Sequence, residues 1–193
     1  MGCMVERYPD LLERVVVLDV ETGGLDPTVH ALVEVALVCG DEHYSARVLD
    51  PTGMMDPAAL AYRGVDARTV LEGARSSQAV ALEVQRWVAD AESRLGRLTL
   101  AGHNVGFDVA FLSRLFTRGR IRLTPPRVLA STYQSVDTHS ILWSWVQRGV
   151  LPESCRRLDG ALTHYGIRVE GRHTALGDAR ATQALLRRLL EAP

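Results

Sequence analysis

The amino-acid sequence predicts an α/β fold, in which three strands come first and strands then alternate with helices. Residues 14–20 are expected to form a buried strand, because Val and Leu fill positions 15–18 without interruption. Residues 31–39 and 43–50 are predicted as the second and third strands, and the short polar links between them favour an antiparallel meander. Farther along, segments with a helical period alternate with short apolar runs, which indicates a sheet covered by helices.

The later elements follow in order along the chain. Residues 52–74 contain two short helical turns, each with an Asp near its start, and residues 77–95 predict a long helix. The remaining expected elements are a short strand at 97–104, a helix at 105–119, a strand ending near Asp137 with a helix that Asp137 caps, a helix at 156–167 closed by Gly166, and a last helix from about Ala175 to Glu191. Because no repeat or linker interrupts this order, we expect one domain over residues 1–193, with its core at about 14–191.

The composition limits the classes of function. The net charge of −1 points away from a disordered tail and from a generally basic nucleic-acid binder. The three cysteines are scattered, with neither disulfide nor zinc-site spacing, as expected for reduced thiols in a cytoplasmic protein. No apolar run approaches the roughly 18 residues that span a bilayer, so we expect no membrane association.

Two carboxylates stand at the end of the first predicted strand. Asp19 and Glu21 point to the same face as Val15 and Val17, because side chains alternate along a strand. That face is therefore expected to point inward. The alternative is a strand end that leaves the core, with both acids solvated at a turn.

Two further acids lie on the apolar faces of predicted helices. Asp108 precedes Phe111, Leu112 and Leu115 at helical spacing. Asp178 stands seven residues before Leu185, which belongs to the apolar stripe of the last helix. Both acids are therefore expected to face inward.

Four inward carboxylates need positive charge, because burying one bare carboxylate costs several kcal/mol. Arg63 and Arg180 can each pair with one acid but not with all four. A divalent cation balances the charge, and carboxylate oxygens suit Mg²⁺ or Mn²⁺ better than zinc. Two such ions about 3.5–4 Å apart support in-line attack on a phosphodiester.

One histidine stands close to this predicted cluster. His173 lies five residues before Asp178, in the loop ahead of the last helix. A histidine beside a phosphodiester can be the general base that activates water. The alternative for this side chain is simple solvation in a loop.

Three motifs of this sequence match a known family. They read "DVETGGL" (19–25), "GHNVGFDVAFL" (102–112) and "RHTALGDARAT" (172–182). In order and spacing they resemble the DEDDh group of DnaQ-like 3′→5′ exonucleases, the group of the proofreading epsilon subunit, ribonuclease T and oligoribonuclease. The resemblance runs from about residue 14 to 190.

The resemblance implies a ribonuclease H-like fold with five mixed strands, the second antiparallel. It also implies release of nucleoside 5′-monophosphates from the 3′ ends of DNA or RNA by two divalent cations, Mg²⁺ or Mn²⁺. Asp19 would bridge the two ions, Glu21 and Asp178 would hold the first, and Asp108 would help to place the second. His173 would deprotonate the attacking water.

The resemblance further implies a binding groove for a single-stranded 3′ end. Its expected members are Thr22 and Gly23 through their backbone, Leu25 against a base, His103, Asn104 and Phe107 along the groove, and Arg63 on a phosphate. Arg63 departs from the family, in which a histidine is common at this position. The stretch between Asp108 and Asp137 contains five arginines and no acid, and some of these arginines are expected to form a basic rim, with a solvated surface as the alternative. The five are Arg114, Arg118, Arg120, Arg122 and Arg127.

Other functions stay open at this point. The chain can be a non-catalytic nucleic-acid-binding module that keeps the fold, or an enzyme for short oligoribonucleotides. A polymerase is a possible partner, but no docking tail follows the last helix, which favours a free-standing nuclease. The sequence leaves the choice between DNA and RNA, the physiological metal and the oligomeric state open.

Overall fold

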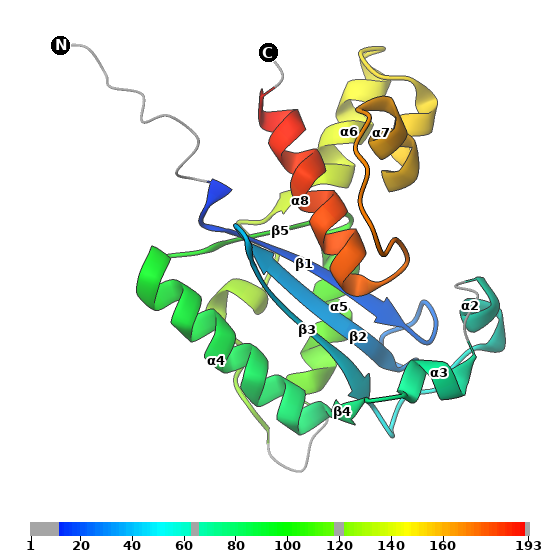
Figure 1. Ribbon diagram of the computed structural model, residues 1–193, viewed down its shortest axis with the longest axis vertical. Coiled ribbons are helices and arrows are strands. Elements are labelled where there is room, and N and C mark those ends of the chain that lie inside the picture. Colours follow the sequence, from blue (N-terminus) through cyan, green and yellow to red (C-terminus); the bar gives the residue numbers. More distant parts are fainter. Residues whose placement is uncertain (1–11, 63–65, 118–121, 192–193) are drawn as a thin grey trace.

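The computed structural model describes residues 12–62, 66–117 and 122–191. Six strands form one sheet in the order β4-β3-β2-β1-β5-β6 (Figure 1). Their bounds are β1 Val15–Thr22, β2 Leu32–Cys39, β3 Glu42–Leu49, β4 Arg75–Ser76, β5 Thr99–Gly102 and β6 Val136–Asp137. β1, β2 and β3 pair antiparallel, whereas β5 pairs parallel with β1 and β6 parallel with β5. The predicted mixed sheet with an antiparallel second strand is therefore confirmed.

The sheet has six strands where five were expected. The additional strand, β4, contains only Arg75 and Ser76 and pairs parallel with the end of β3. Two exposed residues directly before a helix show no alternation of apolar and polar side chains, so the sequence pattern carries no signal for this strand.

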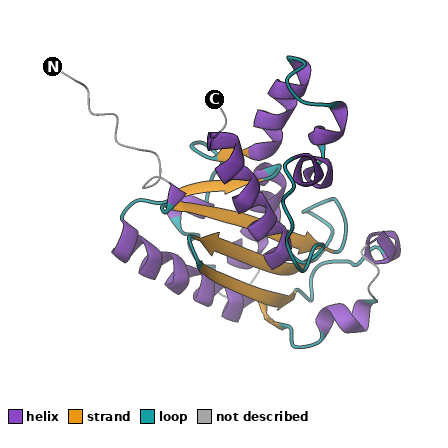
Figure 2. Ribbon diagram, turned by 45° about the horizontal axis from the view of Figure 1, so that its top comes forward, coloured by secondary structure: helices purple, strands orange, loops and turns teal. Residues whose placement is uncertain are grey.

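Helices cover both faces of the sheet (Figure 2). α8 lies on one face, and α4 and α5 lie on the other. The helices are α2 Pro57–Tyr62, α3 Ala67–Leu71, α4 Ser77–Leu95, α5 Val105–Thr117, α6 Thr138–Gln147, α7 Leu158–His164 and α8 Ala175–Glu191, with 3₁₀ turns at Arg127–Leu129 and Glu153–Arg156. The two predicted short helices do begin at aspartates, since Asp56 accepts the N–H of Ala58 and Asp66 that of Thr69.

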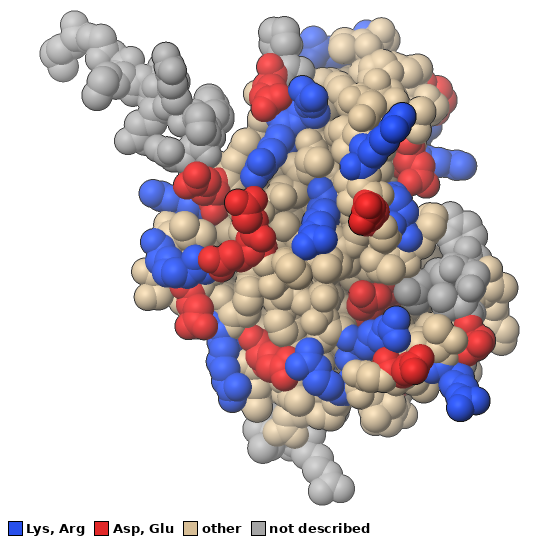
Figure 3. All heavy atoms as spheres, viewed as in Figure 1, with Lys and Arg blue, Asp and Glu red and all other residues tan. Residues whose placement is uncertain are grey.

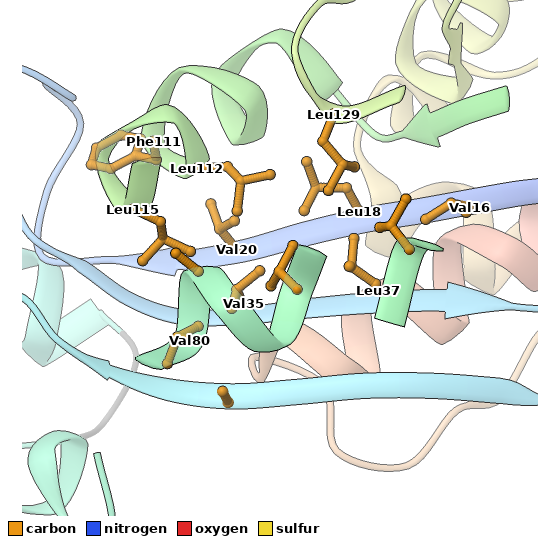
Figure 4. Packing of buried hydrophobic residues seen from close by; sticks show 14 of the residues in the cluster. Val16, Leu18, Val20, Val35, Leu37, Val80, Phe111, Leu112, Leu115 and Leu129 are labelled. Atoms are coloured by element: carbon orange, nitrogen blue, oxygen red, sulfur yellow. The ribbon is translucent and has the colours of Figure 1, made fainter. Parts of the chain in front are cut away.

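The alternation of side chains along β1 decides which residues reach the site. Val16, Leu18 and Val20 point into the larger core and pack with side chains of α4 and α5 (Figure 4). Val15 and Val17 point the other way and pack against α8. Because the period of a strand is two, Asp19 and Glu21 continue the row on the α8 side, as predicted.

A buried ion pair links three segments behind the site. The guanidinium of Arg114, on α5, donates to Asp50 Oδ2 from Nε (2.9 Å) and to the carbonyl oxygen of Pro27 from Nη1 (2.7 Å). Both side chains of the pair are about 95% buried, with 4% and 5% exposed. Burial opposes ionisation of Asp50, but hydrogen bonds from Thr52 and Arg114 outweigh it and lower the pKa of this carboxyl. The pair therefore fixes the loop after β1 to the end of β3 and to α5.

Arg114 does not contribute to the predicted basic rim, because it lies in this ion pair instead of on the surface. Its position on the apolar side of α5 brings it to Asp50, an acid far away in sequence. Arg122 and Arg127 are exposed, as predicted, whereas Arg118 and Arg120 lie outside the described residues.

The surface carries charges of both signs. Basic and acidic side chains are interspersed over the face that α8 covers (Figure 3). Within the described ranges, no helix is long and apolar enough to cross a membrane.

We expect Arg114→Met to lower the free energy of unfolding by about 3–5 kcal/mol, because it leaves the buried Asp50 carboxylate without its counter-ion. The double variant Arg114→Met/Asp50→Leu should recover much of that loss, since neither charge then remains buried. Urea denaturation at pH 7 measures both values. Arg122→Met, at an exposed arginine, serves as the control. Wild-type stability of the single Arg114 variant would contradict the assigned role of the pair.

Candidate active site

Three carboxylates converge at the carboxyl end of β1. Asp19 and Glu21 come from β1, and Asp178 comes from the first turn of α8. Each offers an oxygen atom, and these oxygens lie within 4.8 Å of one another. α8 approaches the sheet closely because Ala175 and Ala179, one turn apart, present small side chains to it. The geometry and the hard oxygen donors fit a divalent cation such as those bound by carboxylates in other proteins.

The fourth predicted carboxylate, Asp108, reaches the same strand from the other face of the sheet. It lies in the first turn of α5 and is 5% exposed. Its Oδ1 accepts the backbone N–H of Val20 at 3.0 Å. The ladder between β1 and β5 covers Val15–Val17, so Val20 lies beyond it, and the carboxylate takes the place of a strand partner there. Asp108 thus lies behind β1, next to the group of three but not part of it.

The electrostatics of the cluster favour a cation. Burial raises the pKa of Asp19 well above its usual value, and the nearby charges of Asp108 and Glu21 raise it further. Burial also raises the pKa of Asp108, to about 8, although the hydrogen bond from Val20 opposes the shift. Carboxylates this crowded favour the protonated state unless positive charge is added, and a divalent cation adds it.

An arginine that was not among the predicted site residues contacts this cluster. Nη1 of Arg172 donates to Oδ1 of Asp178, and its Nε and Nη2 donate to Oδ1 of Asp159, with 3.2 Å for Nε. Arg180, which the sequence offers as a possible partner of one acid, lies near His43 instead, with 3.4 Å between its Nη2 and Nδ1 of His43. Arg63, the other possible partner, lies outside the described residues.

The loop before α8 places His173 beside Asp178. The backbone N–H of His173 donates to Asp178 Oδ1 at 3.1 Å, and its exposed side chain lines the same pocket as the carboxylates. His173 has a φ of 63°, a left-handed conformation. The loop packs directly on Gly177, where a Cβ atom would lie only 1.8 Å from the carbonyl oxygen of Gly171. Only glycine at position 177 permits this close approach.

A pocket of about 560 Å³ contains most of the predicted site. The predicted residues that line it are Asp19, Glu21, Thr22, Leu25, His103, Phe107, His173 and Asp178. The lining residues that were not predicted are Val20, Gly24, Asp56, Ala58, Ala59, Leu158, Asp159 and Arg172. Leu25 is 83% exposed, so its side chain is available to a ligand at the mouth of the pocket.

Among the groove residues that the structure describes, two do not line the pocket. Gly23 is buried, donates its N–H to the carbonyl of Ala31 and lies against Met54, whose carbonyl oxygen a Cβ atom would approach to 2.6 Å. Asn104 is exposed with a φ of 64°, and its backbone N–H donates to Asp137 Oδ1 at 2.8 Å. Both residues shape the backbone next to the pocket.

Asp137 is the N-cap of α6, as predicted. Its Oδ1 accepts the N–H of His139 at 2.9 Å as well as that of Asn104. The same carboxylate therefore starts α6 and joins β6 to the turn before α5.

His103 lines the pocket as a neutral ring. Its Nδ1 lies 3.0 Å from Oγ1 of Thr138, and that hydroxyl donates its proton to the carbonyl of Gly102. Nδ1 of His103 must therefore carry the proton, which leaves Nε2 as an acceptor. Burial and the nearby His139 lower the pKa of His103 to about 4, so the ring stays uncharged at neutral pH.

The pocket residues that were not predicted differ in how clearly the sequence pattern indicates them. Arg172 and Gly24 lie inside the quoted motifs, so their neighbourhood was visible although their contacts were not. Asp159 and Leu158 come from α7, and only the fold brings α7 to the carboxyl end of β1.

Comparison with known families identifies the class. The model of the exonuclease family RNase_T matches residues 16–186, nearly the whole chain. The matched residues therefore include the three convergent carboxylates at the end of β1 and the sheet that carries them. The chain belongs to this exonuclease family, and the predicted enzyme class, a 3′→5′ exonuclease of the DEDDh type, is confirmed.

Two relatives agree with this assignment, and one solved structure shares the fold. Ribonuclease T of Shewanella denitrificans is 29% identical over 187 residues, covering 88% of this chain and 77% of the relative. Ribonuclease T of Shewanella frigidimarina is 28% identical over 185 residues, covering 88% and 79%. The crystal structure of E. coli Exonuclease I with a dT13 oligonucleotide shares the fold, with a TM-score of 0.72 and 17% identity over 92% of this chain. This chain spans only 41% of the Exonuclease I chain.

We expect the metal-free protein to lose stability as the pH rises from about 4 to about 8. The pKa of Asp108 is raised to about 8 in the folded state, so the folded protein binds more protons than the unfolded chain in this window, and deprotonation costs stability. Asp108→Asn should reduce this slope, because Asn keeps an acceptor for Val20 without the charge. Thermal melts in EDTA between pH 5 and 8.5 measure it. Asp90→Asn, on the exposed face of α4, is the control, and equal slopes in both variants would contradict the expectation.

Proposed function

We propose that this exonuclease uses two divalent cations, Mg²⁺ or Mn²⁺, to release nucleoside 5′-monophosphates from the 3′ end of a single strand of DNA or RNA. The observation that carries the proposal is the convergence of three carboxylate oxygens within 4.8 Å, in a pocket that His173 also lines. The family supplies the reaction class, and the donor set suits these ions.

The carboxylates divide the work of holding the ions. Asp19, Glu21 and Asp178 are the ligands from the group of three, and Asp108 contributes negative charge from behind β1 toward the second ion. When bound, the ions stabilise negative charge on the attacking and leaving oxygens of the phosphodiester. We assign these residues their roles from the arrangement of their oxygens and from the family motifs.

His173 is the proposed general base. Its side chain is exposed at the pocket while its backbone N–H is fixed to Asp178, so the ring is held beside the metal ligands without being buried. It accepts the proton of the water that attacks phosphorus. Such a group typically contributes a factor of about 10²–10⁴ in rate.

The rest of the pocket receives the terminal nucleotides. Thr22 and Leu25 line the pocket, and His103 offers Nε2 as an acceptor. Phe107 adds an aromatic ring that packs on Phe111, with ring centroids 4.9 Å apart. We assign Gly23 and Asn104 the role of shaping the protein backbone next to the bound nucleotides. We assign Arg63 the role of binding a phosphate. Structures of Exonuclease I hold single-stranded oligonucleotides, which supports a single-stranded 3′ end as the ligand here.

We further propose that the chain forms one exonuclease domain with its core at about residues 14–191, and that it acts in the cytoplasm. The family match over residues 16–186 supports the first statement. The scattered spacing of the three cysteines in the sequence supports the second.

The direct test is a degradation assay on matched single strands of DNA and RNA, labelled at the 3′ end, with Mg²⁺ or Mn²⁺. We expect mononucleotides to be released and the release to stop with EDTA. Asp19→Asn should abolish cleavage, since it removes a ligand charge, while raising the melting temperature of the metal-free protein by relieving repulsion. Binding without cleavage in either metal would instead indicate a non-catalytic module, and activity confined to strands of a few nucleotides would indicate an enzyme for short oligoribonucleotides.

A second variant isolates the histidine. His173→Asn should lower kcat by about 10²–10⁴-fold, because asparagine cannot take the proton. Asparagine tolerates the left-handed backbone that His173 adopts, so the loop should keep its shape. Titration of Mn²⁺ by calorimetry should show wild-type affinity. Near-normal turnover would remove His173 from the mechanism.

A further inference from the structure

Arg172 lies between the metal cluster and a second acid. Its guanidinium donates to Asp178 Oδ1 with one nitrogen and to Asp159 Oδ1 with the other two. The side chain is 22% exposed and lines the same pocket as Asp19 and His173. One planar fork therefore joins a proposed metal ligand to an acid on α7.

The contact with Asp178 conflicts with metal binding. Asp178 is one of the three acids whose oxygens converge, and its Oδ1 already accepts from Arg172 and from the N–H of His173. A divalent cation at this cluster repels the guanidinium and competes with it for the carboxylate of Asp178.

The contact with Asp159 has no such conflict. Asp159 is 66% exposed and does not belong to the three convergent acids, although it lines the same pocket. It can hold the guanidinium in the pocket after Asp178 is given up. A guanidinium held there presents donors at the geometry that phosphate oxygens accept.

We propose that Arg172 is an internal competitor of the metal: it neutralises Asp178 in the metal-free site, leaves Asp178 when a cation binds, and then, held by Asp159, binds a phosphate oxygen of the nucleic acid. The inference rests on the proposed function, because it takes Asp178 as a metal ligand. Arg172 is thus a substrate-binding residue whose availability depends on the metal.

The first measurement is Mn²⁺ binding to the full chain by calorimetry, without nucleic acid. Arg172→Gln should bind Mn²⁺ about tenfold more tightly than the wild type, on the scale of a hydrogen bond between charged groups. Arg172→Lys should lie between the two, because it keeps the charge but cannot span both acids. Arg168→Gln, at an exposed arginine in the same loop, is the control and should match the wild type.

The second measurement is the affinity of the Mn²⁺-saturated protein for AMP and for dTMP. Arg172→Gln should bind each nucleotide about tenfold more weakly, although it binds the metal more tightly. Tighter binding of Mn²⁺ together with weaker binding of the nucleotide is the result expected if Arg172 moves from Asp178 to a phosphate. A merely structural role of Arg172 would weaken the binding of both ligands.

The outcomes separate this inference from the function it rests on. Equal or weaker Mn²⁺ binding by a folded Arg172→Gln protein overturns the competition, and unchanged nucleotide binding overturns the move to phosphate. If the folded wild type binds no Mn²⁺, or binds it as well after Asp19→Asn, the proposed metal site itself fails. Thermal melts of each variant establish that it is folded.

Discussion

The site depends on the packing of β1 between helices on its two faces, because this packing holds carboxylates together at the end of the strand although they repel one another. Asp19, Glu21 and Asp178 meet on one side of the strand, and Asp108 approaches from the other. The hydrophobic core forces this meeting, because Val15 and Val17 fix the face of β1 that α8 covers, and Val16, Leu18 and Val20 fix the face for α5. The burial of apolar side chains thus offsets the free-energy cost of placing like charges together. A bound cation removes this electrostatic repulsion.

Polar contacts away from the cluster hold the pocket walls. The Arg114–Asp50 pair fixes the loop that carries Leu25, through the carbonyl of Pro27. Asp137 fixes the turn after β5 through Asn104, and Thr138 fixes the ring of His103. Each wall is therefore anchored by a residue that does not touch the pocket itself. Preorganised walls of this kind let binding energy act on the substrate instead of on ordering the protein.

Periodicity alone predicts most of the fold and the acids of the site. The strands and long helices follow from apolar spacing, and the inward faces of Asp19, Glu21, Asp108 and Asp178 follow from the same spacing. The pairings of the arginines did not follow, because a guanidinium on a long side chain can reach many partners. Arg114 is buried in an ion pair with Asp50, Arg172 contacts Asp178, and Arg180 lies near His43. Asp159 was missed because α7 reaches the site only through tertiary packing.

Among the described residues other than glycine, only Asn104 and His173 have a positive φ. Each comes one or two residues before a helix whose first turn carries an acid of the site, α5 with Asp108 and α8 with Asp178. Besides glycine, the residues that best tolerate this conformation are Asn, Asp and His, which also carry polar groups able to contact a ligand. At both positions, the amino acids that tolerate the backbone conformation are therefore also those that can contact a ligand. A β-branched residue at either position would strain the backbone, whatever its effect on catalysis.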